Sequence, residues 1–246
     1  MAATVFYLDD IPEPGATAVL DGPEGRPAAT VRRIRVGAPI PLSDGHGTLA
    51  DSEVVAAAKD RLELKVLSKR VAEPWTPQVT VVQALPKSDR SELAVELMTE
   101  AGADAIVPWQ ALRCVSNWDS KARKGVEKWR AAAKQAARQS RRAYIPDVAD
   151  LHSTKELLEL VRTAKSSGAI VAALHESGES RLTELSFDGV PEVILIVGPE
   201  GGLDDSELKS LTEAGADAVL LGPTVLRTST AAAVALGALG ALTPRW

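Results

Sequence analysis

Two glycine-bearing loops near the end of the chain carry residues suited to binding a ligand and accepting a proton. The first is Gly198-Pro199-Glu200-Gly201-Gly202, and the second runs over residues 222–228. Glycines let backbone approach a ligand closely, and the Glu200 carboxylate can accept hydrogen bonds or a proton. The first loop lacks the Lys-Ser/Thr pair of a P-loop and the GxGxxG spacing of a dinucleotide site. The alternative is a tight turn ahead of a helix.

Two further side chains in this region could take part in binding or catalysis. Arg227 stands directly before Thr228, Ser229 and Thr230, hydroxyl residues that can cap a following helix. The alternative for Arg227 is a surface salt bridge. His175 is one of three histidines, and its side chain is intrinsically suited to proton transfer near neutral pH. A packed or solvated histidine is the competing interpretation.

Buried strands must position these loops. Residues 193–197 form an unbroken apolar, β-branched run, which is typical of a strand buried on both faces. Residues 218–221 are predicted to form a second short strand, and residues 203–214 and 229–242 to form helices. In an open α/β sheet the ligand lies beyond the carboxyl ends of the strands. We therefore expect a ligand site where the two loops leave the sheet.

Strands and helices also alternate upstream. We expect strands at 79–84, 105–108 and 170–174, and helices at 91–101, 120–140 and 154–165, with Ser88 or Asp89 capping the first helix and Ser153 the last. The segment 99–105 recurs as 212–218, and each copy places a glycine, Gly102 or Gly215, where a helix ends. The alternation predicts a parallel sheet with crossover helices.

The first seventy residues follow a different pattern. Short strands are expected at 5–8, 16–20, 40–42, 48–55 and 62–67, with a turn at 21–25 and a hairpin turn at 44–47. Residues 30–37 alternate and are basic, as in a strand. Arg32, Arg33 and Arg35 there are candidates for phosphate contact, or charges that protect a sheet edge. We predict a β-rich module at 1–72, a linker at 73–77 and an α/β domain at 78–246.

The predicted helix at 120–140 reverses the charge of an otherwise acidic chain. Between residues 119 and 142 there are nine basic and two acidic residues, whereas the whole chain has a formal net charge of −5. Val126, Trp129, Ala133, Ala136 and Ser140 lie at core spacing. The basic face would displace counterions from a phosphate backbone, or it is simply solvated. Candidate nucleic-acid contacts on and beside this helix are Lys128, Gln135, Arg138, Gln139, Arg141 and Arg142.

Composition narrows the class of protein. The chain has 246 residues, of which 45% are hydrophobic and 25% charged, as expected of a globular protein with a sizeable core. A single cysteine, Cys114, excludes an internal disulfide framework and a cysteine-based zinc site, and fits a reducing, cytoplasmic setting. We expect no signal peptide, no membrane span and no metal.

The loop motifs together resemble one family. The resemblance rests on residues 197–202 and 221–231 and on a central motif, Ala136-Ala137-Arg138-Gln139-Ser140-Arg141-Arg142. These segments are similar to those of the ribosomal RNA small subunit methyltransferase E family, which belongs to the knotted SPOUT methyltransferases. Residues 31–37 resemble its N-terminal module. The resemblance implies an α/β fold in which a PUA-like β-barrel module precedes a SPOUT domain with a trefoil knot. It also implies a homodimer.

The resemblance further implies an activity and its residues. Members use S-adenosylmethionine to methylate N3 of uridine 1498 in 16S rRNA of the small ribosomal subunit. Arg227 would stabilise charge on the uracil, and Glu200 would accept the proton or bind the cofactor. The implied cofactor residues are Leu174, His175, Glu176, Val197, Gly198, Pro199, Glu200, Gly201, Gly202, Leu220, Leu221, Gly222, Val225, Leu226 and Thr228. The alternatives are a non-catalytic RNA-binding or ribosome-assembly protein, and a SPOUT methyltransferase for another RNA.

Overall fold

The structure, a computed structural model, describes residues 5–31 and 34–246 and divides into two compact units. Unit 1 comprises Met1–Pro74 and Ala137–Ile145, and unit 2 comprises Trp75–Ala136 and Pro146–Trp246. The first crossing between units falls within the predicted linker. The return of residues 137–145 to unit 1 was not indicated by the sequence pattern, and the domain assignment made from the sequence stays a prediction.

Unit 1 is built on a five-stranded sheet in the order β1-β3-β4-β5-β2. Its strands are β1 (Phe6–Tyr7), β2 (Thr17–Leu20), β3 (Pro39–Ser43), β4 (Thr48–Ala57) and β5 (Leu62–Val71). The predicted hairpin is confirmed, because β3 and β4 pair antiparallel across the turn at residues 44–47. Alternate residues of β4 and β5, including Val54, Leu62, Leu64 and Val66, are fully buried in the core of this unit.

Two predictions for unit 1 were wrong. The expected turn at 21–25 is a short helix, α1 (Gly22–Arg26), and it continues into a π-helical turn, η1 (Pro27–Val31), where a strand had been expected. Gly25 permits this packing, because a Cβ atom there would lie 2.4 Å from the Leu20 carbonyl oxygen. Arg35 follows as an exposed residue outside any strand, and Arg32 and Arg33 lie outside the described residues.

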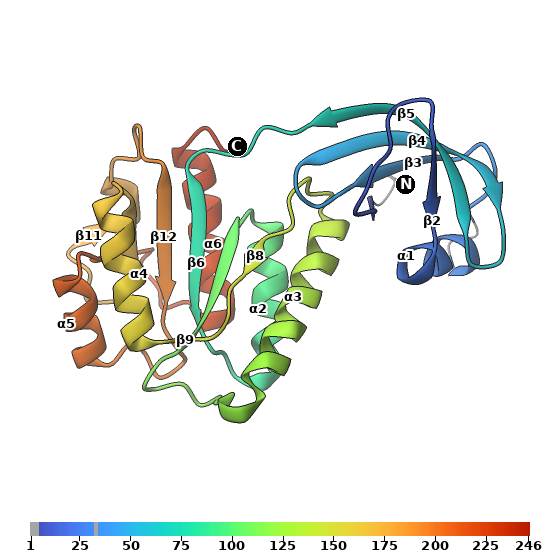
Figure 1. The fold of residues 1–246 in the computed structure, drawn as a ribbon. Coiled ribbons are helices and arrows are strands. Elements are labelled where there is room, and N and C mark those ends of the chain that lie inside the picture. The colour runs from blue at the N-terminus through green and yellow to red at the C-terminus, as the bar shows by residue number, and fades with distance from the viewer. Residues whose placement is uncertain (1–4, 32–33) are drawn as a thin grey trace. The chain divides into compact units, whose positions relative to one another are not determined.

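Unit 2 is an α/β sandwich (Figure 1) around a parallel sheet in the order β11-β13-β10-β12-β6-β7-β8, with β9 also paired to β7. Its strands are β6 (Gln78–Ala84), β7 (Ala105–Gln110), β8 (Asp147–Val148), β9 (His152–Ser153), β10 (Ile170–Leu174), β11 (Ser180–Arg181), β12 (Glu192–Val197) and β13 (Asp217–Leu220). Its helices are η2 (Ser88–Arg90), α2 (Ser91–Glu100), η3 (Asp119–Lys121), α3 (Ala122–Gln139), whose residues from 137 on belong to unit 1, α4 (Thr154–Ser166), η4 (Leu182–Glu184), α5 (Asp205–Glu213) and α6 (Thr228–Leu242). The predicted parallel sheet is confirmed.

The two faces of this sheet bury different residues of the same strands. In β12, Val193, Leu195 and Val197 pack with residues of α2, α3 and α6, whereas Ile194 and Ile196 pack with residues of α4 and α5. This is why the run at 193–197 lacks the polar alternation of a half-exposed strand. The core spacing predicted along α3 is confirmed for Val126, Trp129, Ala133 and Ala136, but Ser140 is exposed.

Helix ends were predicted less well than helix centres. Ser153 caps α4 through a capping box with Glu156, as expected, and Gly102 and Gly215 have the positive φ angles that end α2 and α5. However, the N-cap of α2 is Arg90 rather than Ser88 or Asp89, because residues 88–90 form a preceding 3₁₀ turn. The N-cap of α6 is Arg227, which makes no side-chain cap bond.

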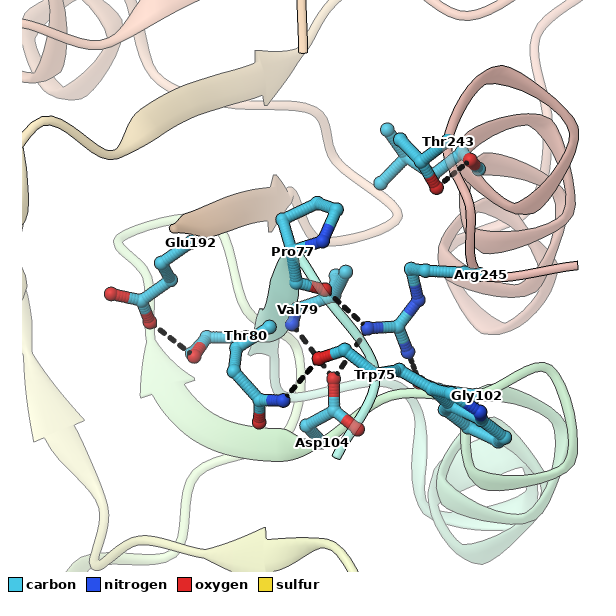
Figure 2. A network of polar contacts seen from close by, with 11 residues as sticks. Trp75, Pro77, Val79, Thr80, Gly102, Asp104, Glu192, Thr243 and Arg245 are labelled. Atoms are coloured by element: carbon cyan, nitrogen blue, oxygen red, sulfur yellow. Dashed lines mark hydrogen bonds and ion pairs between the residues drawn. The ribbon is translucent and has the colours of Figure 1, made fainter. Parts of the chain in front are cut away.

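A buried arginine clamp ties the C-terminal segment to the start of unit 2 (Figure 2). The Arg245 side chain is 3% exposed, and its Nη1 lies 2.7 Å from Oδ2 of Asp104. The guanidinium also donates to the carbonyls of Pro77 and Gly102 and lies 5.1 Å from the centre of the Trp75 ring. The same Asp104 oxygen accepts a hydrogen bond from the amide of Val79 at the start of β6. These bonds therefore fix the segment that follows α6 against the residues that precede β6 and β7.

In the described parts of the chain, none of the helices combines the length and apolar character that crossing a membrane requires.

We predict that Arg245→Ala lowers the free energy of unfolding by about 3–5 kcal/mol, since it removes a buried guanidinium and leaves the Asp104 carboxylate, which is only 15% exposed, without its charged partner. Urea denaturation measures this loss. Arg61→Ala is the matched control, because Arg61 pairs with Glu63 where both side chains are more than 40% exposed, and its loss should stay below about 1 kcal/mol. An equal loss of unfolding free energy in the two variants would contradict the stabilising role of Arg245.

Candidate active site

A cavity of about 450 Å³ lies at the carboxyl ends of β10, β12 and β13. It is lined by the loops that follow these three strands and by the start of α6. The structure brings together here every residue that the sequence suggested for cofactor binding, namely Leu174, His175, Glu176, Val197, Gly198, Pro199, Glu200, Gly201, Gly202, Leu220, Leu221, Gly222, Val225, Leu226 and Thr228. That they bind a cofactor stays a prediction.

Strand register explains why segments so far apart in sequence meet. β10 lies between β12 and β13 and pairs parallel with both, so that Leu174 is opposite Val197 on one side and Val219 on the other. All three strands thus end at nearly the same height. Gly178 allows the β10 loop to lie directly on β13, because a Cβ atom at this position would come within 2.6 Å of the Val219 carbonyl carbon.

Four lining residues were not named individually as cofactor contacts in the sequence analysis: Leu203, Pro223, Thr224 and Ala231. Leu203 directly follows the first loop, and a Cβ atom on Gly198 would meet its side chain at 3.0 Å. Pro223 and Thr224 lie inside the second loop, so their position alone could have suggested them. Ala231 reaches the cavity because the first turn of α6 faces it.

Two polar side chains of the cavity, Glu200 and His175, already form hydrogen bonds. One carboxylate oxygen of Glu200 accepts a hydrogen bond from the amide of Lys87 at 3.0 Å, which joins the first loop to the segment after β6. Nδ1 of His175 accepts from the Ser177 amide at 3.2 Å and lies 2.7 Å from the Ser177 hydroxyl.

Arg227 is exposed and is not among the residues that line the cavity. Its neighbours Leu226 and Thr228 both line the cavity, so Arg227 lies at the rim of the cavity. Its carbonyl accepts hydrogen bonds from the amides of Thr230 and Ala231, and this fixes its backbone at the start of α6. No hydrogen bond or ion pair of its guanidinium is found within the described residues.

A polar network supports the first loop from behind. Glu207 of α5 is 2% exposed, and its Oε1 accepts from the amide of Leu112 at 3.0 Å and from the hydroxyl of Thr154 at 2.9 Å. Arg113 donates to the carbonyl of Leu203 and pairs with Asp204 at 3.0 Å. Hydrogen bonds from Ser206, together with this arginine, lower the pKa of Asp204. The network joins the segment after β7 to the loop after β12.

The candidate RNA-contacting residues divide into two groups. Lys128, Gln135, Gln139 and Arg141 are exposed, as Arg35 is. In contrast, Arg142 is 6% exposed, and Arg138 forms an ion pair with Glu24 of α1.

A contact with Tyr7 explains part of the burial of Arg142. The Tyr7 hydroxyl donates to the carbonyl of Arg142 at 3.3 Å, and burial raises the pKa of Tyr7 to about 12 despite the nearby arginines.

Within the described residues, no group of three or more His, Cys, Asp or Glu side chains is placed to hold a metal ion.

Comparison with known proteins decides the family. Residues 73–240 match the model of the RNA methyltransferase domain. The chain is 55% identical, over its whole length and 94% of the relative, to ribosomal RNA small subunit methyltransferase E of Mycobacterium bovis. The chain belongs to the ribosomal RNA small subunit methyltransferase E family. The resemblance drawn from the two loops is thereby confirmed.

Other members of the methyltransferase E family agree in sequence and in structure. The Bacillus subtilis protein is 33% identical over 92% of this chain and 91% of its own length. A crystal structure of the Neisseria gonorrhoeae protein bound to S-adenosyl methionine superposes with a TM-score of 0.88, at 26% identity, and covers 98% of both chains.

We predict that Glu207→Ala destabilises the protein by about 1–3 kcal/mol, because the Leu112 amide and the Thr154 hydroxyl lose the acceptor that their partly buried hydrogen bonds share. Urea denaturation measures this loss, and hydrogen exchange of the Leu112 amide should become faster. Glu213→Ala on the same helix is the control, since that side chain is 67% exposed. Unchanged exchange at Leu112 would refute the supporting role of Glu207.

Proposed function

We propose that the chain is an S-adenosylmethionine-dependent methyltransferase that methylates N3 of uridine 1498 in 16S rRNA of the small ribosomal subunit. The observation that carries this proposal is the cavity at the ends of β10, β12 and β13, formed by the family's own motifs. Family membership supports the reaction class, and the cofactor-bound relative supports the choice of cofactor.

The cavity suits a nucleoside-containing cofactor. Its volume of about 450 Å³ lies in the ordinary range for small-molecule sites. Apolar side chains such as Leu174, Leu221 and Leu226 offer contacts to an adenine ring, and the glycine loops offer backbone groups within reach. The carboxylates of Glu176 and Glu200 are the charged groups in the lining that suit a cationic sulfonium compound. The residues present therefore fit S-adenosylmethionine.

Bound S-adenosylmethionine supplies a methyl group already activated for displacement. The protein must then align uridine and remove the proton from N3, which is protonated at neutral pH. We assign Glu200 as the candidate proton acceptor, since its second carboxylate oxygen is not used by the Lys87 amide. Arg227 at the rim would stabilise the negative charge that develops on the uracil oxygens.

RNA contacts are proposed for the exposed basic and amide residues: Arg35, Lys128, Gln135, Gln139 and Arg141. Arg32 and Arg33 belong to the same proposal, although they lie outside the described residues. Arg138 and Arg142 are not included among the proposed RNA contacts, because Arg138 is paired with Glu24 and Arg142 is buried.

The finer architecture is part of the proposal. Unit 1 would be a PUA-like barrel that binds RNA, and unit 2 a SPOUT domain with a trefoil knot. Contacts of α6 with β12, β6 and η4 support the knot, since they carry the last helix back across the sheet after β13. We further propose that the enzyme is a homodimer and acts in the cytoplasm, where small subunits are assembled.

We predict that Arg227→Ala lowers turnover about 10²–10³-fold, as loss of one charge-stabilising donor does, while the dissociation constant for S-adenosylmethionine stays unchanged. Single-turnover methylation and calorimetry separate the two quantities. Arg162→Ala on α4, which removes an exposed arginine away from the cavity, should leave both unchanged. Wild-type turnover in Arg227→Ala would remove Arg227 from the mechanism.

The function is tested by incubating the protein with labelled S-adenosylmethionine and small ribosomal subunits that lack the modification, then mapping the product by mass spectrometry. Gly222→Val is the matched variant, because Gly222 lines the cavity and a Cβ atom there meets nothing within 4 Å, so that the fold should tolerate a bulkier residue in the cavity lining. A single 3-methyluridine, absent with Gly222→Val, supports the proposal. Methylation elsewhere would indicate another RNA substrate, and absence of cofactor binding would indicate a non-catalytic RNA-binding protein.

A further inference from the structure

A second cavity of unit 2, of about 660 Å³, lies beside the candidate active site. We call it the lysine hollow and define it by Lys87, Lys121, Lys124, Lys128, Trp118 and Trp129 among its lining residues. Its walls are the segment after β6, the start of α2, the segment after β7 and the first half of α3. The function proposed above uses only Lys128 of this set.

The charge of the lysine hollow favours an anion. Four lysines line it, against the two carboxylates of Asp89 and Glu92. Lys128 lies 3.7 Å from Glu92, and Asp89 lies 3.8 Å from Arg90. No ion pair of Lys87, Lys121 or Lys124 is found in the described parts of the chain. These three ammonium groups, together with the positive end of the α3 dipole, are suited to hold a phosphodiester.

Trp118 gives the lysine hollow a fixed aromatic surface. Its ring packs on the backbone of α3 at Gly125, where a Cβ atom would lie only 2.5 Å from the indole. It also meets Trp129 edge to face, with ring centres 5.3 Å apart. Trp129 in turn is anchored by a 2.8 Å hydrogen bond from its Nε1 to the Ser91 hydroxyl. An indole held in this way can stack a base without being ordered first.

The lysine hollow shares a wall with the candidate active site. Lys87 lines the hollow and Glu200 lines the cofactor cavity, and the Lys87 amide donates to the Glu200 carboxylate at 3.0 Å. Behind this contact the Ser116 hydroxyl donates to the Pro86 carbonyl at 2.7 Å, which ties the segments after β6 and β7 together. A strand of RNA with its target base at Glu200 has its next nucleotide within reach of Lys87.

We propose that the lysine hollow binds a nucleotide that neighbours the methylated uridine in single-stranded RNA. Lys87, Lys121 and Lys124 contact its phosphate, and Trp118 stacks on its base. This inference rests on the proposed function, because it takes RNA as the substrate. Cations combined with an aromatic platform are the usual means of holding single-stranded nucleic acid, whereas an acidic peptide would require only the cations.

The test measures binding of a fluorescent octauridylate by anisotropy over a range of salt concentrations, with polyphosphate as a competitor that has no bases. Trp118→Ala should weaken octauridylate binding about tenfold and leave polyphosphate binding unchanged. Lys121→Gln/Lys124→Gln should weaken both, and its plot of log affinity against log salt should be shallower by roughly 1.4, since each phosphate contact contributes about 0.7. Lys155→Gln/Arg162→Gln, which removes the same charge from α4, is the control.

Calorimetry with S-adenosylmethionine separates this proposal from the preceding one. Unchanged cofactor affinity in both lysine-hollow variants and an unchanged melting temperature in the double lysine variant, with weakened octauridylate binding by both, supports the inference. Wild-type octauridylate affinity in both variants would overturn it. An equal loss in the α4 control would also overturn it, since only the overall charge would then matter. Polyphosphate affinity that falls with Trp118→Ala would exclude base stacking. Failure of the wild-type protein to bind S-adenosylmethionine counts against the proposed function instead.

Discussion

The parallel pairing of β10 with both β12 and β13 is the constraint on which the candidate active site depends. It places Leu174 level with Val197 and with Val219, so that three loops leave the sheet together. A shift of one residue in either pairing would turn every side chain of that strand to the opposite face. Both faces are buried, so the helices on both sides of the sheet hold this register. The loops need little contact with one another, because the strands have already brought them together.

The centre of unit 2 was predictable for a physical reason. A strand buried on both faces needs an uninterrupted apolar run, and residues 193–197 and 170–174 are short apolar runs of this kind. The loops between such strands carry the family motifs, so the residues of the cavity could be named before their geometry was known. Their arrangement at one edge followed from the rule that parallel strands end together.

What could not be predicted depends on contacts between distant segments. The helical course of residues 22–31 relies on space that Gly25 leaves at the Leu20 carbonyl, which no local pattern reveals. The burial of Arg142 and the pairing of Arg138 with Glu24 depend on α1 and β1, more than 100 positions away in sequence. A basic stretch therefore indicated a nucleic-acid surface over its whole length, whereas its last turn takes part in the core of unit 1.

That last turn has a consequence for modularity. Ala137 and Ile145 pack with Val5 and Tyr7, so the smaller unit is completed by a piece of chain inserted between halves of the larger one. A shortened chain that begins at Trp75 would keep this inserted piece but expose the apolar surface that Val5 and Tyr7 cover. The N-terminal unit is therefore not a cassette that evolution or an engineer can exchange at a single junction. Recombination between relatives must carry residues 137–145 along with residues 1–74, or rebuild the cluster they share.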